Sequence, residues 1–151
     1  MLDDTDRRIL RQLQAQPDLA TPDLAELCRI STAVCWRRLE KMQAAQIIQA
    51  QEAIIDWAAL GYAVEVSLRI SLDKTQPRAF DEFQAAAREV PEVLEIQTFL
   101  GRVDVRLSVI ARDMAQYQQL YRDRILTLPH IADIEALMLI SRVKSDEGLP
   151  L

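Results

Sequence analysis

The chain has 151 residues, half of them hydrophobic, and a formal net charge of −5. This length suits one ordinary domain or two small ones, and a net negative charge is unusual for a stand-alone DNA-binding protein. The acidic N-terminus lacks the apolar core of a secretory signal, and no apolar run approaches the length of a membrane span. We therefore expect a soluble, cytoplasmic protein of a reducing compartment, with no membrane partner.

The first expected helix extends to about Gln16, where Pro17 ends it. Asp3 or Asp4 is expected to be its N-cap, because a short acidic side chain accepts hydrogen bonds from the first free backbone N–H groups. Acidic residues in the first turn also suit the helix dipole. The apolar stripe consists of Ile9, Leu10 and Leu13.

Residues 21–42 predict two short helices joined by a tight turn. Thr21 is a good N-cap for the first of them, with Pro22 in the first helical position, and Ser31 is expected to cap the second. This spacing is typical of a helix-turn-helix, whose second helix enters the major groove of DNA, although an ordinary αα-hairpin is an alternative. Arg29 occupies the turn position where the motif usually has glycine, which adopts a positive φ at low cost. The inward-facing apolar residues would be Leu24, Leu27, Cys28, Ile30, Cys35, Leu39 and Met42.

The opposite face of the second helix carries the candidate DNA contacts. We expect phosphate contacts from Arg37, Arg38 and Lys41. Base or methyl contacts are expected from Thr32, Ala33 and Trp36. Residues 29–41 include four basic residues and one acid, which is a modest local excess of positive charge. Such a weak surface favours DNA binding through several copies in an oligomer. The predicted DNA-binding residues are Ser31, Thr32, Ala33, Trp36, Arg37, Arg38 and Lys41.

Cys28 and Cys35 are the only cysteines of the chain, and His130 is the only histidine. Both cysteines lie on expected inward faces of neighbouring helices, so we interpret them as small buried hydrophobic residues. One histidine and two cysteines cannot complete a four-ligand zinc site. The sequence therefore predicts no metal and no cofactor.

The second half of the chain predicts alternating strands and helices. The strand Tyr62–Leu72 has strict period-two alternation of apolar and polar residues, which indicates one buried face. Before it, Ile47 to Ile55 is expected to be extended, either as a wing strand or as an interdomain arm. After it we expect a helix between Pro77 and Pro91, strands at 93–100 and 103–110, a helix from Asp113 to Leu128, and a strand from Ile131 to Val143.

The resulting order, β-α-β-β-α-β, is that of a ferredoxin-like split βαβ unit, with both helices on one sheet face. The other face would carry Phe99, Leu137 and Leu139, apolar side chains that no remaining element covers. An uncovered apolar sheet face indicates a partner, and a second copy of the chain is the simplest one.

Several motifs in this order and spacing resemble the Lrp/AsnC family, the feast/famine transcriptional regulators of bacteria and archaea. The resemblance implies dimers that pair through the C-terminal domain, often four of them assembled into an octamer that wraps double-stranded DNA. It also implies a small effector, commonly an amino acid, bound at the contact between dimers. The matching stretches are residues 2–10, 24–31, 36–42, 59–62, 90–95, 101–104 and 127–131, and the ending from residue 143.

The resemblance places an effector-binding loop at Leu100, Gly101, Arg102, Val103 and Asp104. Arg102 and Val103 depart from the family, which often has an acid or amide and an aromatic residue there. A guanidinium at Arg102 would suit an effector carboxylate. The alternatives are a loop that has lost the usual ligands, or an ordinary hairpin tip. The family also often has glycine at the positions of Arg29, Gln46 and His130.

The sequence thus predicts an α+β protein with a three-helix winged-helix/helix-turn-helix head at 1–46, an arm at 47–61 and a ferredoxin-like βαββαβ domain at 62–151. Its predicted function is an oligomeric, DNA-binding transcriptional regulator modulated by an amino acid. An effector-insensitive architectural DNA-binding protein is an alternative. A sirohaem-decarboxylase-like enzyme has the same two-part architecture, but those enzymes use histidines at the haem cleft, and this chain has one histidine and no evident nucleophile–base pair.

Overall fold

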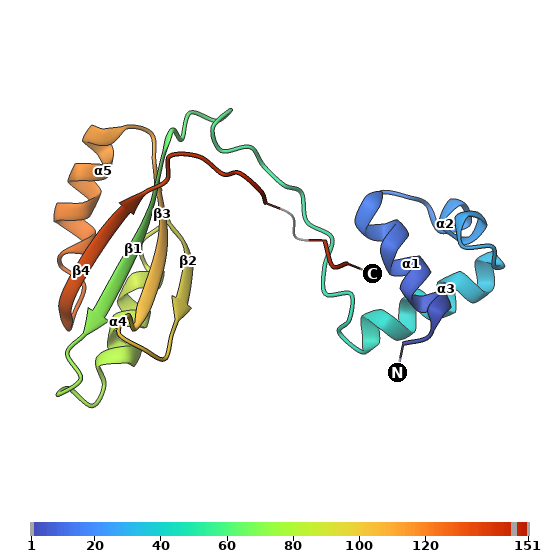
Figure 1. Cartoon of the computed structure of the whole chain (residues 1–151), viewed down its shortest axis with the longest axis horizontal. Helices are drawn as coiled ribbons and strands as arrows, with labels where there is room; N and C mark the ends of the chain where they lie inside the picture. Colours follow the sequence, from blue (N-terminus) through green and yellow to red (C-terminus); the bar gives the residue numbers. More distant parts are fainter. Residues whose placement is uncertain (1, 146–147, 151) are drawn as a thin grey trace. The chain divides into compact units, whose positions relative to one another are not determined.

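The computed structural model describes residues 2–145 and 148–150, which form two compact units. The head contains the residues up to Ile54 together with those from Lys144 onward, and the tail contains residues 55–143 (Figure 1). No helix in the described part of the chain is long and apolar enough to cross a membrane.

The head consists of three helices, α1 (Asp4–Ala15), α2 (Thr21–Leu27) and α3 (Thr32–Ala44). Asp3 caps α1 as predicted, and Ser31 caps α3 by accepting a hydrogen bond from the Val34 N–H. The N-cap prediction for Thr21 is wrong by one residue. The carbonyl of Ala20 already accepts the first helical bond, from the Leu24 N–H at 3.0 Å, so Thr21 is the first helical residue and Pro22 the second. Proline is tolerated there because its missing N–H would have no helical partner.

The core of the head is built from the predicted stripes. Ile9 of α1, Leu24 of α2 and Met42 of α3 are almost completely buried. Cys28 and Cys35 are also buried and free, and burial raises the pKa of both thiols. The prediction that both cysteines are buried core residues is therefore confirmed. The prediction for Leu27 is wrong, since 52% of its surface is exposed.

Three non-glycine residues have a positive φ in the described chain, namely Arg29 (55°), Gln46 (55°) and His130 (65°). They are the three positions where the Lrp/AsnC family, by resemblance, often has glycine. The conformation at Arg29 closes α2, because the N–H groups of Arg29 and Ile30 bond back to the carbonyls of Glu26 and Ala25 at 3.0 Å. The turn of a helix-turn-helix is thus formed without its usual glycine.

The segment between the head and the first strand contains no strand of its own. Residues 49–56 have no regular secondary structure, so the predicted wing strand within 47–55 does not form, and the alternative of an extended arm describes this segment. Ile48 packs against the head core, whereas Ile54 is 93% exposed. Ile55, the next residue, is 54% exposed.

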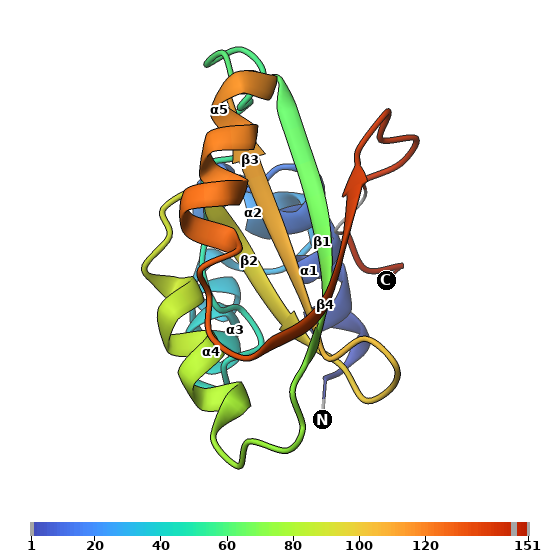
Figure 2. The same cartoon turned by 90° about the vertical axis from the view of Figure 1, so that its left-hand side faces the viewer.

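The tail forms the predicted β-α-β-β-α-β arrangement. Its sheet has the order β2-β3-β1-β4 with every pair antiparallel, which is the order of a ferredoxin-like fold. Helices α4 and α5 cover the same face of the sheet (Figures 1 and 2). The elements are β1 (Val64–Leu72), α4 (Ala79–Arg88), β2 (Val93–Thr98), β3 (Val105–Ala111), α5 (Met114–Leu120) and β4 (Ile131–Met138).

The ends of β1, β2 and β3 lie within two residues of the predicted ends, whereas two other tail elements end well before the predicted residue. The helix expected up to Leu128 is α-helical only to Leu120, and a π-helical turn, Tyr121–Ile125, continues it. The last strand ends at Met138 rather than Val143, and its register with β1 runs to Val66 opposite Met138. Hydrophobic periodicity continues past both ends, which is why the sequence does not reveal where the regular pairing stops.

The tail core confirms the alternation predicted for β1. Val66, Leu68 and Ile70 are completely buried against Phe83 of α4 and Leu107 of β3. The same hydrophobic cluster includes residues of α5 and of the π-helical turn. The two helices are therefore held on the sheet by one continuous apolar layer.

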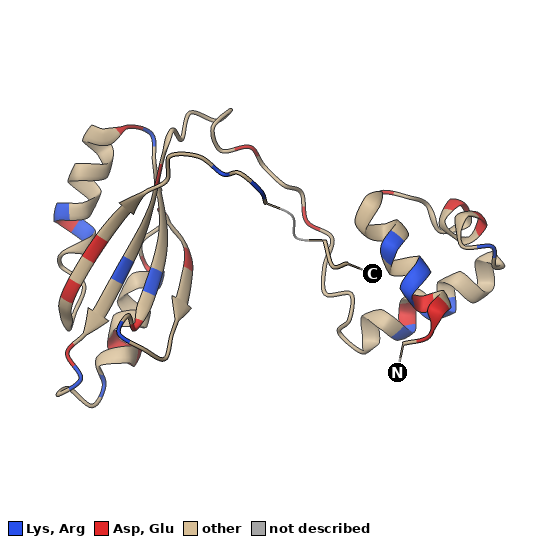
Figure 3. Ribbon diagram, viewed as in Figure 1, with Lys and Arg blue, Asp and Glu red and all other residues tan. Residues whose placement is uncertain are grey.

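The other sheet face is more polar than predicted. Phe99 and Leu139 are about half exposed, as the sequence suggested. However, charged side chains also lie across this face, and Arg106 of β3 pairs with Glu95 of β2 at 3.1 Å. Figure 3 shows these charges on the strands of the sheet. The face therefore combines apolar groups with ion pairs.

Candidate functional site

Helix α3 presents one face to solvent and the other to the head core. Cys35 and Met42 lie on the buried side. On the opposite side Trp36 is 56% exposed, and Arg37 beside it is also exposed. The predicted contact residues Ser31, Thr32 and Ala33 at the start of the helix are likewise exposed. The structure thus gathers six of the seven predicted DNA-binding residues, the six exposed ones being Ser31, Thr32, Ala33, Trp36, Arg37 and Lys41.

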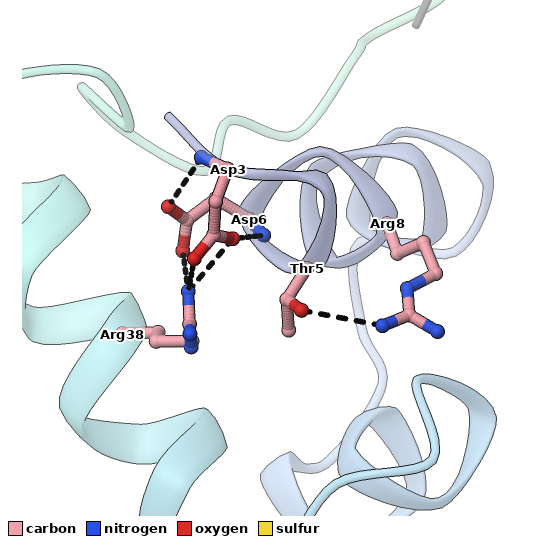
Figure 4. A network of polar contacts seen from close by, with 5 residues as sticks. All are labelled: Asp3, Thr5, Asp6, Arg8 and Arg38. Carbon is pink, nitrogen blue, oxygen red and sulfur yellow. Dashed lines mark hydrogen bonds and ion pairs between the residues drawn. The ribbon is translucent and has the colours of Figure 1, made fainter. Parts of the chain in front are cut away.

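Arg38 differs from the other two cations of α3. Its Nη1 lies 2.7 Å from Oδ2 of Asp3 and 2.7 Å from Oδ1 of Asp6 (Figure 4). The Arg38 side chain is 28% exposed and the Asp6 side chain only 7%. Arg37 and Lys41 remain exposed, whereas the guanidinium of Arg38 is engaged by two carboxylates from the start of α1.

The Asp3 and Asp6 side chains are fixed by the helix that they begin. The Asp6 N–H donates to Oδ1 of Asp3 at 2.9 Å, and the Asp3 N–H donates to Oδ2 of Asp6 at 3.1 Å. This capping box satisfies two free donors of α1 reciprocally. The hydrogen bond from the Asp6 backbone, together with the bond from Arg38, lowers the pKa of Asp3. The sequence pattern indicated Asp3 only as a possible cap and did not single out Asp6.

In the tail, the predicted effector loop connects β2 to β3. Leu100, Gly101 and Arg102 are exposed at its tip, and Val103 is half-buried. Gly101 has a φ of 156°, and a Cβ at this position would meet no atom within 4 Å, so backbone conformation rather than space favours glycine there. The Arg102 side chain is free to reach outward while its carbonyl accepts a hydrogen bond from the Ser71 hydroxyl at 2.8 Å.

Asp104 closes this loop onto the end of β1. Its Oδ2 accepts a hydrogen bond from the Leu72 N–H at 2.9 Å, and its Oδ1 lies 3.1 Å from the Lys74 ammonium. Its backbone N–H also donates to the Ile70 carbonyl at 2.9 Å. The carboxylate is only 4% exposed. Asp104 therefore attaches the end of the loop to β1, and Arg102 is an exposed charge at the loop tip.

Some neighbours of the site were not selected from the sequence. Ser71 and Lys74 contact the predicted effector loop, although they lie about 30 residues before it in the chain. Antiparallel pairing of β1 with β3 brings the two segments together. The described residues contain no group of three or more His, Cys, Asp or Glu side chains arranged as metal ligands.

A helix-turn-helix head with an exposed basic helix face, followed by a ferredoxin-like tail, is typical of two-domain, DNA-binding transcriptional regulators. Comparison with known families agrees with both parts. A winged helix-turn-helix DNA-binding model matches residues 2–49, and the Lrp/AsnC ligand binding domain matches residues 65–149. The chain belongs to the Lrp/AsnC family of transcriptional regulators.

Individual relatives support this assignment over almost the whole chain. The DNA-binding transcriptional activator DecR of Escherichia coli is 26% identical, with 100% of this chain and 99% of the relative covered. The proline dehydrogenase transcriptional activator of Rhodobacter capsulatus is 31% identical, over 87% of this chain and 86% of the relative. Among solved structures, a transcriptional regulator of Neisseria meningitidis in complex with L-Met has a TM-score of 0.91 and 27% identity, covering 99% of this chain and 97% of that one.

Proposed function

We propose that this regulator binds double-stranded DNA through the exposed face of α3. The observation that carries the proposal is that Trp36 and Arg37 lie in solvent, directly opposite the buried Cys35–Met42 stripe. Arg37 and Lys41 would contact phosphates, and Thr32, Ala33 and Trp36 would contact base edges or thymine methyl groups. The hydroxyl of Ser31 caps the helix, which leaves its backbone for phosphate contact.

The variant Arg37→Ala in the full chain tests this proposal. We expect weaker binding to the duplex that the parent protein selects from a randomised pool, and a salt slope smaller by about one, because one phosphate contact is lost. Arg7→Ala is the matched control, since Arg7 is an exposed arginine of the same head on α1. Unchanged affinity in a folded Arg37→Ala protein would remove Arg37 from the interface.

We also propose that an amino acid or a related small carboxylate binds at the loop Leu100–Asp104. Arg102 offers an exposed guanidinium for the carboxylate, while Asp104 holds the loop base. The L-Met complex of the Neisseria regulator supports an amino acid as the chemical class. The effector would shift the population of assembly states by binding one of them better.

We propose a homodimer, assembling further to an octamer, as the working form, acting in the cytoplasm and without a catalytic step of its own. The exposed Phe99 and Leu139 and the ion pairs of the outer sheet face support pairing through the tail. Light scattering coupled to gel filtration, with a panel of free amino acids, tests both the assembly and the effector. We expect one amino acid to change the assembly size in the parent but not in Arg102→Ala, with Arg88→Ala on α4 as the control.

A constant assembly size with every amino acid would contradict the effector proposal and leave DNA binding untouched. In that case equal affinity for all sequences, with a steep salt dependence, would identify the alternative of an architectural DNA-binding protein. A parent protein that selects one sequence from the pool excludes this alternative.

A further inference from the structure

Arg38 makes three hydrogen bonds to two carboxylates of the head. Its Nη1 donates to Oδ1 and Oδ2 of Asp3 at 2.8 and 2.7 Å, and to Oδ1 of Asp6 at 2.7 Å (Figure 4). These residues lie 35 and 32 positions before Arg38 in the chain. The contact therefore ties the middle of α3 to the first turn of α1.

The two carboxylates of this contact are also held by the start of α1. Asp3 and Asp6 hold each other through the capping box, so their carboxylates are directed by the backbone of α1. Asp6 is also 5% exposed as a residue, which leaves it little freedom to turn away. Charged hydrogen bonds to a guanidinium are strong and directional. Arg38 consequently has a defined position on α1, set by two fixed acceptors.

The contact of Arg38 with Asp3 and Asp6 is directional, whereas the apolar contacts of α3 are not. Cys35 and Met42 decide which face of the helix is buried, but hydrophobic contacts have no preferred direction and tolerate small slides. Successive residues of an α-helix are about 100° apart around its axis, as 3.6 residues make a turn. A bond at Arg38 therefore also sets how the neighbouring Arg37 and Trp36 face the solvent.

The same contact makes Arg38 a poor phosphate ligand. Two carboxylates within 2.8 Å already surround one end of its guanidinium. A DNA phosphate would compete with both of them and would approach two negative charges. Asp3 and Asp6 also offset part of the positive charge that the sequence places on α3.

We propose that Arg38 is a positioning residue, which holds α3 through Asp3 and Asp6 in the orientation that presents Trp36 and Arg37 to DNA, and that it does not contact phosphate itself. The inference rests on the proposed DNA-binding role of α3. It changes the role of one residue that the sequence assigned to the phosphate backbone.

Asp6→Asn changes DNA affinity in opposite directions for the two possible roles of Arg38, positioning residue and phosphate ligand. Asparagine keeps the size of the side chain and some of its hydrogen bonding, so the helix start is retained. If Arg38 only positions α3, Asp6→Asn weakens binding to the selected duplex by about tenfold, equivalent to about 1.4 kcal/mol, although it removes a negative charge from the protein. If Arg38 is a phosphate ligand restrained by its acids, the same variant releases it and tightens binding to any DNA.

The control is Asp4→Asn, which removes the same charge from an exposed neighbour on α1. Affinity is measured by fluorescence anisotropy with the full-length protein, on the selected duplex and on a scrambled duplex of equal composition. We expect Asp4→Asn to leave the preference for the selected duplex unchanged, and Asp6→Asn to reduce it. A tighter or unchanged Asp6→Asn protein would overturn the inference.

Arg38→Ala gives a second, independent measurement through the salt dependence of binding. A lost phosphate contact lowers the slope of log affinity against log salt by about 0.9. We expect Arg38→Ala to keep the parent's slope on the scrambled duplex while losing its preference for the selected one, and Arg38→Lys to recover part of that preference. A slope lower by about one on both duplexes, with the preference intact, would make Arg38 a phosphate contact.

These outcomes are distinct from a failure of the proposed function. A parent protein that binds no duplex, or an Arg37→Ala variant that binds as well as the parent, would contradict the role of α3 itself. Circular dichroism and the thermal unfolding of each variant establish that the head is folded. Since Asp6→Asn and Arg38→Ala break the same contact from opposite sides, a folded protein of either kind is sufficient for the test.

Discussion

The Nε2 atom of His130 lies 2.6 Å from Oε2 of Glu82, which joins the residue before β4 to helix α4. His130 has a φ of 65°, and its carbonyl accepts a hydrogen bond from the Asp73 N–H at 2.8 Å. The histidine thus connects the end of β1, the start of β4 and one helix of the tail. The family resemblance led us to expect glycine at this position, which would have no side chain to make the Glu82 contact.

We expect the Glu82 contact to contribute to stability in a defined pH range. The hydrogen bond from His130 lowers the pKa of Glu82 below its ordinary value of 4.5, and the charges of His130 and Arg78 act in the same direction. A carboxylate with a lowered pKa in the folded state stabilises the fold above its unfolded pKa and loses that contribution as the pH falls through its folded pKa. Glu82→Gln should therefore unfold at lower urea concentration than the parent near pH 6, and the difference should shrink below about pH 4.

Glu89→Gln is the control for that measurement, because Glu89 is an exposed acid at the end of the same helix. We expect no pH-dependent difference between Glu89→Gln and the parent. A Glu82→Gln protein that tracks the parent at both pH values would show that the contact adds nothing to stability.

Asp104→Ala should destabilise the tail by about 2 kcal/mol, because a buried charged acceptor is removed from the Leu72 N–H and the Lys74 ammonium. Urea unfolding followed by circular dichroism measures the loss. Asp104→Asn still offers an oxygen to the Leu72 N–H, so we expect a smaller loss. Asp133→Ala on β4 is the control, since Asp133 is exposed. An equal and small effect of both alanine variants would mean that Asp104 is not structural.

Arg29→Gly should raise the free energy of unfolding of the head by about 1 kcal/mol, because a side chain in the left-handed region carries a steric cost that glycine avoids. Glu40→Gly, at an exposed position within α3, should lower it by about 1 kcal/mol, the cost of glycine in a helix interior. Hydrogen exchange of the buried amides of the head measures both effects. Destabilisation by Arg29→Gly would show that this side chain makes a compensating contact.

Gln14→Ala should release the last described residues from the head. The side-chain amide of Gln14 donates to the Leu149 carbonyl at 3.3 Å and accepts from the Leu149 N–H at 2.6 Å. We expect faster exchange of the Leu149 amide in Gln14→Ala and no change in Gln16→Ala, another exposed glutamine at the end of α1. Exchange that is equally fast in the parent would contradict this pairing in solution.

Local features of this protein could be predicted from the sequence. The caps at Asp3 and Ser31 depend on contacts three residues apart, and the strand β1 depends on strict alternation, so a short stretch of sequence contains the whole signal. The positive φ at Arg29 and Gln46 was not predicted, because nothing in an arginine or a glutamine indicates this conformation; the family resemblance showed only that glycine is frequent at both positions. Element ends and the π-helical turn were not predicted, since periodicity does not report where hydrogen bonding changes.

The sequence by itself determined the helical head, the βαββαβ order and the exposed face of α3, because each follows from the pattern of apolar residues along one element. Only the tertiary structure decided what Arg38 and Asp104 do. Arg38 meets Asp3 and Asp6 across more than 30 residues, and Asp104 meets Leu72 across 32. These charges are paired because separate elements pack together. The residues next to a charged side chain in the sequence do not show whether it is solvated or bound by a distant partner.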